Sequence, residues 1–188
     1  MNMDNNIKIV ELKKNDVYPS SLASKYLTFG YYDLSINREP DCWKVGLILK
    51  SFEKALDKNY QGKLFEDHVE EPRLFAAEHA SRQVGWIELG YEKWNNRMRV
   101  WEFLVQEGFR RRRIGTLLMN RAVKIAEERG ARMLVLETQT CDVPAINFYL
   151  KFGFELIGFD AAAYSNEDVE KKEVRLELGL RLGERALC

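Results

Sequence analysis

The run Arg110–Thr116 (RRRRIGT) constrains this chain most, because it joins a predicted strand to a long predicted helix. The preceding segment, Met98–Val105, is β-branched and aromatic, which is typical of a strand. From Ile114 to about Arg129 the apolar residues recur at the i, i+3, i+4 and i+7 spacing of one buried helix face, and Gly130 ends the helix. That face consists of Ile114, Leu117, Leu118, Ala122, Ile125 and Ala126. The compact apolar run Met133–Thr138 follows, so the segment predicts a right-handed strand–helix–strand crossover with parallel strands.

A basic turn at a helix N-terminus is suited to a compact anion such as a pyrophosphate. The helix end carries free N–H groups and roughly +0.5 of an elementary charge, and Gly115 lets a ligand approach the backbone. A solvated basic turn and a nucleic-acid patch are the alternative interpretations of four consecutive arginines. The chain has 29 Lys+Arg and 29 Asp+Glu, whereas a long polyanion usually meets a more basic domain. We therefore expect no nucleic-acid partner. The fingerprints G-x-x-x-x-G-K-[ST] and G-x-G-x-x-G are absent from this turn.

The N-terminal third is predicted to contain one strand and helical segments. Ile7–Leu12 alternates as a strand, and Asn15 or Asp16 is a candidate helix cap for the aromatic, serine-rich stretch that follows. Trp43–Lys58 is predicted to be a helix, because its apolar residues fall at helical spacing: Val45, Ile48, Leu49, Phe52 and Leu56. Gly62 and the acidic stretch FEDHVEEP predict a loop, which is either a solvated surface turn or an acidic lip for a cationic substrate.

The rest of the chain predicts a meander, the crossover, a second helix and two closing strands. The second helix starts near Asp142, with Pro144 in its first turn, and ends at Gly153. The other predicted strands are Leu74–Ala80, Val84–Tyr91, Phe154–Ala163 and Val174–Leu182. We expect a single α+β (α/β mixed) domain over residues 1–188, with a mixed sheet of about six or seven strands flanked by helices.

The cysteines and histidines argue against disulfides and metal sites. Cys42, Cys141 and Cys188 are widely spaced and odd in number, which suits reduced thiols in a cytoplasmic protein. His68 and His79 lack paired Cys/His spacing, so we expect no metal. No stretch approaches the length of a membrane span, and the polar start MNMDNNIKIV does not resemble a secretion signal.

Two motifs resemble the GNAT superfamily of acyl-CoA-dependent N-acetyltransferases. The turn RRRRIGTLL follows a strand, and ETQ..DVPAINFYLKFGF follows one helix and one strand later; the resemblance is strongest over Met98–Phe159. In the family pattern [QR]-x-x-G-x-[GA], Arg110 fits the first position and Gly115 the last, while Arg113 replaces the middle glycine. Within the superfamily, LETQTCDVPAINFYLKFGFELIGFDAAAY is similar to the streptothricin acetyltransferases.

The resemblance implies acetyl-CoA as cosubstrate and assigns roles to several residues. The backbone of the turn would hold the pyrophosphate: Arg110, Arg111, Arg112, Arg113, Ile114, Gly115 and Thr116. Backbone groups of Leu104 and Val105, where the family splays its strands, would pair with the pantetheine arm. Tyr149 follows the family tyrosine that protonates the leaving thiolate. Asp142 stands where relatives commonly carry the asparagine that contacts the cofactor.

Direct attack of an amine on the thioester requires removal of a proton, since a lysine-type amine has a pKa of about 10.4. Glu102 is the candidate base, because it lies in an otherwise apolar strand on the face opposite Phe103; the alternative is an ordinary surface or hydrogen-bonded glutamate. Glu137 and Gln139 are candidates to shape the acceptor pocket. Cys141 would permit an acyl-enzyme route, which is disfavoured because no histidine is near in sequence to form its thiolate.

These inferences predict an N-acetyltransferase that acts on a primary amine of a small cationic acceptor, including a streptothricin-like antibiotic. Acetylation of a protein or amino-metabolite amine is a second hypothesis. A non-catalytic module that binds acyl-CoA for regulation is a third. The protein is expected to be a monomer or a homodimer.

Overall fold

A computed structural model describes residues 7–16 and 21–183 of the chain. The extreme N-terminus and Cys188 lie outside the described residues. The described chain forms two compact units. The first contains residues 7–16, 21–25, 59–136 and 180–183, and the second contains residues 26–58 and 137–179.

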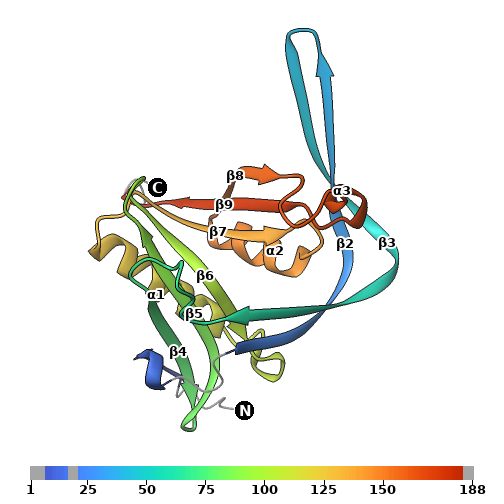
Figure 1. Cartoon of the computed structure of the whole chain (residues 1–188). Coiled ribbons are helices and arrows are strands. Elements are labelled where there is room, and N and C mark those ends of the chain that lie inside the picture. The colour runs from blue at the N-terminus through green and yellow to red at the C-terminus, as the bar shows by residue number, and fades with distance from the viewer. Residues whose placement is uncertain (1–6, 17–20, 184–188) are drawn as a thin grey trace. The chain divides into compact units, whose positions relative to one another are not determined.

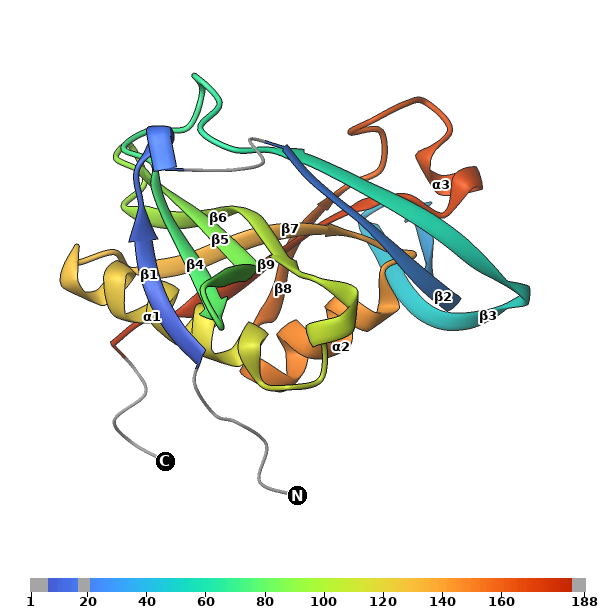
Figure 2. The same cartoon turned by 90° about the horizontal axis from the view of Figure 1, so that it is seen from below.

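Antiparallel strands form the frame of the first unit (Figure 2). Along the chain they are β1 (Ile7–Leu12), β4 (Arg73–His79), β5 (Arg82–Glu92) and β6 (Arg97–Val105). Each strand in this list pairs with the next. The pairing of β4, β5 and β6 confirms the predicted meander, and β1 adds a strand beside β4. The fifth strand, β7 (Met133–Gln139), pairs in parallel with β6 over four residues of each strand. This pairing confirms the predicted crossover.

The crossover helix α1 (Ile114–Glu128) packs against β4, β5 and β6. Gly85 of β5 marks a close approach, since a Cβ there would lie 3.2 Å from Leu118 Cδ1 and 3.3 Å from Ile114 Cγ2. The predicted apolar face is buried except for Leu117, which is 41% exposed. The N-terminal part of the helix therefore turns one predicted core residue toward solvent.

A hydrophobic cluster in the same unit joins the sheet to the ends of a long hairpin. The hairpin strands are β2 (Ser21–Glu39) and β3 (Cys42–Lys63) (Figure 1). Leu22 comes from β2, and Leu64 follows β3 directly. The complete cluster is Leu22, Leu64, Leu74, Ala76, Trp86 and Leu104.

The hairpin corrects two predictions. The expected helix over Trp43–Lys58 is wrong, because these residues belong to β3. Asn15 and Asp16 do not cap an α-helix; they lie in the single 3-10 turn Lys14–Asp16, which precedes β2. β-Branched and aromatic residues favour strands, and the turn at Pro40 and Asp41 lets β2 and β3 pair, so backbone pairing outweighs the helical spacing.

The second unit contains the middle of the hairpin, α2 (Val143–Phe152), β8 (Glu155–Asp160), α3 (Asp168–Lys171) and most of β9 (Arg175–Arg181). Its apolar core includes Leu34, Ile146, Val174 and Leu176. The tip of the hairpin extends away from β8 and β9 (Figure 1). The expected polar turn between β8 and β9 includes the short helix α3.

The predicted ends of α2 are confirmed. Asp142 Oδ1 accepts a hydrogen bond of 3.1 Å from the Ala145 N–H, and Pro144 lies in the first turn. Gly153 ends the helix with a φ of 111°, a left-handed conformation that glycine adopts readily. The strands outside the hairpin form a mixed sheet of seven strands in the order β1-β4-β5-β6-β7-β9-β8, as the α+β interpretation predicted.

Candidate active site

The basic turn brings an uncapped helix N-terminus to the end of β6. Arg113 is the N-cap residue of α1 and adopts a left-handed conformation with a φ of 63°. Among the described residues, its side chain makes no capping hydrogen bond. The first N–H groups of a helix have no acceptor within the helix, so Ile114, Gly115 and Thr116 present donors suited to an anion. Arg113 therefore holds a left-handed conformation that glycine adopts readily, at a cost of about 1–2 kcal/mol.

The four arginines of the turn divide into two kinds. Arg110 is half-buried and anchors the turn: its Nε donates to the Val105 carbonyl at 3.2 Å and its Nη2 to Ser24 Oγ at 2.5 Å. The side chains of Arg111, Arg112 and Arg113 are exposed. Three exposed arginines thus precede the helix N-terminus, and Arg112 stacks over the Phe109 ring at 5.2 Å, while Arg110 fixes the turn to the strand before it.

Glu102 lies on β6 directly opposite Glu88 of β5. The pairing register shifts just beyond this pair, where Leu89 faces Val100, so Trp101 lies between two paired positions as a β-bulge. Glu102 is half-buried, and alternation along the strand puts it on the face opposite Phe103, as predicted. Two carboxylates thus occupy neighbouring cross-strand positions in a largely apolar sheet.

The surroundings of Glu102 hold its pKa near neutrality. Burial raises the pKa most, a hydrogen bond from the Tyr60 hydroxyl lowers it, and the negative charge of Glu88 raises it again, giving a value of about 7. The pKa of Glu88 is also raised, chiefly by burial, although its Oε1 accepts a 2.7 Å hydrogen bond from the Phe65 N–H. A carboxylate that titrates near pH 7 is suited to general-base catalysis.

Glu102 lines a cavity of about 490 Å³ within the first unit. The cavity is bounded by the start of β2, the end of β3 and the acidic loop. Its lining residues are Ser21, Leu22, Ala23, Gln61, Gly62, Lys63, Glu66 and Glu102. Glu66 also lines a second cavity of about 650 Å³, together with Asp67 and His68. The acidic loop therefore contributes a carboxylate to the cavity that holds Glu102.

The end of β6 carries the backbone groups expected to meet the pantetheine arm. Parallel pairing with β7 covers Arg97–Val100 of β6 and Met133–Leu136 of β7. On its other edge, β6 pairs with β5 as far as Val105. The Val105 carbonyl already accepts a hydrogen bond from Arg110. The contact of Leu104 and Val105 with a pantetheine arm stays a prediction.

Tyr149 and Asp142 belong to the second unit. Tyr149 is 7% exposed, and its ring centroid lies 5.6 Å from that of Phe148 and 5.9 Å from that of Phe154. Burial raises the pKa of the Tyr149 hydroxyl, so it keeps its proton at neutral pH. Asp142 caps α2, which gives its carboxylate a structural role apart from any cofactor contact.

Cys141 is buried and lacks the surroundings of a nucleophile. Its Sγ donates to Gln139 Oε1 at 3.7 Å and lies 3.9 Å from the Tyr26 hydroxyl. Burial raises the pKa of the thiol, which favours the protonated form at neutral pH. These contacts argue against an acyl-enzyme on Cys141.

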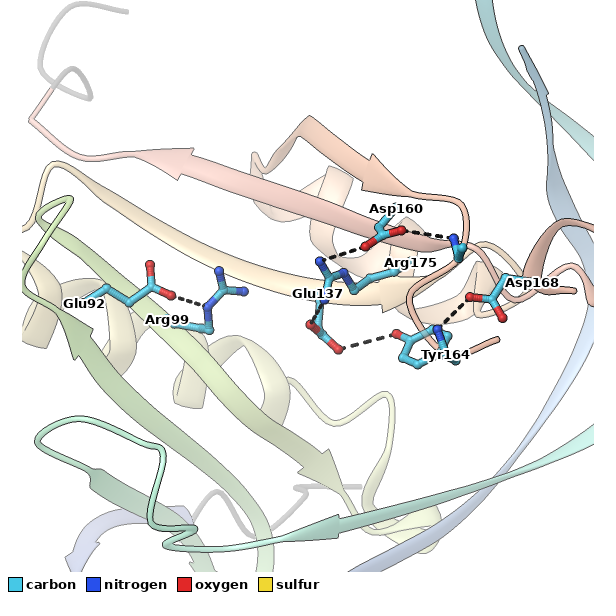
Figure 3. Close-up of polar contacts among 8 residues, drawn as sticks. Glu92, Arg99, Glu137, Asp160, Tyr164, Asp168 and Arg175 are labelled. Carbon is cyan, nitrogen blue, oxygen red and sulfur yellow. Dashed lines mark hydrogen bonds and ion pairs between the residues drawn. The ribbon is translucent and has the colours of Figure 1, made fainter. Parts of the chain in front are cut away.

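Glu137 lies in a polar network of the second unit (Figure 3). Its Oε2 is 3.7 Å from an Arg175 nitrogen, and its Oε1 accepts a 3.4 Å hydrogen bond from the Tyr164 hydroxyl. Arg175 also lies 3.6 Å from Asp160. In the first unit, Glu92 and Arg99 form a separate ion pair at 2.6 Å (Figure 3). Glu137 is thus paired with a cation and a phenol.

The described residues meet neither the requirements of a metal site nor those of a membrane-spanning helix. Within residues 7–16 and 21–183, no group of three or more His, Cys, Asp or Glu side chains could hold a metal ion. None of the helices in that part of the chain is long and apolar enough to span a membrane.

Sequence reasoning identified Glu102 but missed the residues around it. Tyr60 donates to Glu102, and Gly62 leaves room for its carboxylate. Both belong to the end of β3, beyond the predicted helix Trp43–Lys58, and the prediction that Gly62 lies in a loop is wrong. The pairing of Glu88 with Glu102 could have been found, because both are acidic residues in the middle of strands of the predicted meander.

Comparisons with known proteins identify the family of the chain. The model of the acetyltransferase (GNAT) family matches residues 38–154. A streptothricin acetyltransferase of Streptomyces lavendulae is 38% identical over 93 residues, which is 49% of this chain and 49% of the relative. The chain thus spans about half the length of these curated relatives of the streptothricin acetyltransferase group.

Solved structures extend the similarity along the chain. Nourseothricin acetyltransferase superposes with a TM-score of 0.74 at 25% identity, over 93% of this chain and 98% of that one. A protein assigned as a streptothricin acetyltransferase of Bacillus anthracis str. Ames, solved with acetyl coenzyme A, has the same fold, with a TM-score of 0.70 at 22% identity over 94% and 97%. Because the family model covers more than half of its residues, the chain belongs to the acetyltransferase (GNAT) family.

Proposed function

We propose that the protein transfers the acetyl group of acetyl-CoA directly to a primary amine of a small cationic acceptor. The observation that carries this proposal is the cavity in which Glu102, with a pKa of about 7, and Glu66 are both lining carboxylates. Such a cavity attracts a cation and contains a group able to remove its proton. The names of the similar proteins support a streptothricin-like antibiotic as the acceptor.

The turn before α1 supplies what a pyrophosphate needs. The amides of Ile114, Gly115 and Thr116 would donate to its oxygens, and the exposed Arg111–Arg113 side chains would balance its charge. The Arg110 side chain would hold the turn in place through Val105 and Ser24. Backbone groups of Leu104 and Val105 would orient the pantetheine arm, and Asp142 would act through the position of α2.

The chemical step needs no covalent enzyme intermediate. Glu102 takes a proton from the acceptor ammonium, and the neutral amine nitrogen attacks the thioester carbonyl carbon. The new C–N bond forms, and the C–S bond breaks as the tetrahedral intermediate collapses. Tyr149 gives its proton to the leaving sulfur of coenzyme A, and the second amine proton passes to solvent or back to Tyr149. The products are an acetamide and free coenzyme A.

Turnover with a panel of amines tests the proposal. Release of coenzyme A would be followed by chromatography, because the exposed Cys42 would react with a thiol reagent. The panel contains streptothricin, an aminoglycoside, a polyamine, amino acids and short peptides. We expect release with streptothricin or another small polycation. Release with peptide N-termini alone would favour protein acetylation, and acetyl-CoA binding without release from any amine would favour the non-catalytic module.

A further inference from the structure

Tyr60 lies next to Glu102 although the two residues are 42 positions apart in the chain. We propose that Tyr60 is a positioning residue: its hydroxyl donates a hydrogen bond that holds the Glu102 carboxylate in one orientation toward the acceptor cavity. The inference rests on the proposed role of Glu102 as the base. Tyr60 itself need not touch either substrate.

The geometry of β3 supports this role. Tyr60 donates a hydrogen bond to Glu102 Oε2. Gly62 lies two residues further along β3 and therefore on the same face of the strand as the Tyr60 side chain, because successive residues face opposite sides. A Cβ on Gly62 would lie only 2.5 Å from Glu102 Cδ and 2.7 Å from Oε1. One face at the end of β3 thus provides both a donor and the space for the carboxylate.

The charges around Glu102 explain why a donor is needed. Glu88 on β5 and Glu66 on the acidic loop both favour the protonated form of Glu102. Lys63 lines the same cavity, and its backbone hydrogen bond favours the ionised form. Burial and the neighbouring carboxylates raise the pKa of Glu102, and two hydrogen bonds lower it. The hydrogen bond from Tyr60 has the larger effect of the two.

The Tyr60 ring and its hydroxyl can be separated experimentally. The ring packs against the cluster that contains Leu22 and Leu64, which a phenylalanine would also do. The hydroxyl donates to Glu102, which a phenylalanine cannot do. Tyr60→Phe therefore removes the donor with little change in volume. Tyr91→Phe is the matched control, because the Tyr91 hydroxyl donates to Asn96 Oδ1 at 2.8 Å, away from Glu102.

The decisive measurement is the pH profile of kcat at saturating acetyl-CoA and acceptor. Loss of the donor favours the protonated form of Glu102 and so raises its pKa. The acidic limb of the kcat profile of Tyr60→Phe should therefore move up by about one pH unit. Near pH 6 the variant should then be at least about tenfold slower than the wild type, and the smaller loss of kcat that remains at about pH 9 measures the lost orientation of the carboxylate. The KM for acetyl-CoA and the profile of Tyr91→Phe should not change. An acidic limb of Tyr60→Phe that coincides with the wild type would overturn the inference.

Two further variants keep the inference separate from the proposed function. If Glu102→Gln keeps wild-type turnover, the base assignment itself fails. If Glu102→Gln is inactive while Tyr60→Phe has a wild-type profile, only the role of Tyr60 fails. Should Tyr60→Phe fold poorly, 3-fluorotyrosine at position 60 gives a test with an intact ring. Its more acidic phenol is a stronger donor, so the acidic limb should move down, and an unmoved limb would count against the inference.

Discussion

Gly62→Ala is a small change that should separate the position of Glu102 from the stability of the fold. Gly62 is buried at the end of β3, and the added methyl would lie 2.5 Å from Glu102 Cδ. Carbon atoms in contact are normally about 3.5–4.0 Å apart, so the carboxylate must retreat by about 1 Å. It would then leave the orientation in which Tyr60 holds it.

The expected effects on rate and stability differ in size. A misplacement of about 1 Å at a reacting group can lower turnover about 100-fold, and we expect kcat to fall by that order. The group that moves is the end of a flexible side chain, so the free energy of unfolding should change by less than about 1 kcal/mol. The affinity for acetyl-CoA should stay the same, because the proposed pyrophosphate site is at the α1 N-terminus and Glu102 is not part of it.

Steady-state kinetics, calorimetric titration of acetyl-CoA and thermal denaturation together test this expectation. Gly158→Ala is the control, since a Cβ there has its nearest neighbour at 3.8 Å, an ordinary contact. If Gly62→Ala folds and keeps wild-type kcat, the exact placement of Glu102 does not matter to the reaction. A large loss of stability together with activity would show that β3 cannot absorb the methyl group.

Three other variants test other parts of the reasoning. Tyr149→Phe should lower kcat at least tenfold by removing the proton for the thiolate, with an unchanged acetyl-CoA affinity by calorimetry; an unchanged rate would remove Tyr149 from catalysis. Gly115→Val should abolish detectable acetyl-CoA binding by blocking access to the turn backbone, and undiminished affinity would mean that the cofactor lies elsewhere. Glu102→Gln should be more stable than the wild type by on the order of 1–3 kcal/mol at about pH 8, as measured by chemical denaturation.

The sign of this last effect follows from the raised pKa. The folded wild type binds the Glu102 proton up to about pH 7, whereas the unfolded chain loses it near the ordinary value of 4.5. Ionisation therefore costs the folded state stability as the pH rises from 4.5 to about 7, and the cost is complete above that range. The advantage of Glu102→Gln should vanish below about pH 4.5 and be largest in alkaline solution; a constant advantage would contradict the raised pKa.

Sequence reasoning succeeded where local signals agree with one another. The apolar spacing of α1 and the caps of α2 act within a few residues. The run that forms β7 is short and apolar, which is typical of a buried parallel strand. The hairpin was missed because Val45, Ile48 and Leu49 fit either a helical face or a strand. Only pairing with β2 decides between the two, and that pairing is a tertiary contact.

The same limit applies to the candidate site. The turn Arg110–Thr116 is continuous in sequence, so its helix N-terminus could be predicted. The environment of Glu102 is assembled from β3, β5 and the acidic loop. Glu88 lies on the neighbouring strand of the predicted meander, but Tyr60 and Glu66 could not be placed beside Glu102 from local patterns. Because these contacts set its pKa, the base could be named from the sequence but its titration could not.

The two described cysteines differ in exposure, so the rate of thiol labelling can report local opening of the second unit. Cys42 is exposed, and Cys141 is fully buried in the second unit. A thiol reagent should modify Cys42 at once, while Cys141 should react only in molecules whose second unit has opened. In a variant with Cys42→Ser and Cys188→Ser, the slow labelling rate of Cys141 would therefore measure how often that unit opens in the native state. Repeating the labelling with acetyl-CoA present would show whether the cosubstrate suppresses that fluctuation.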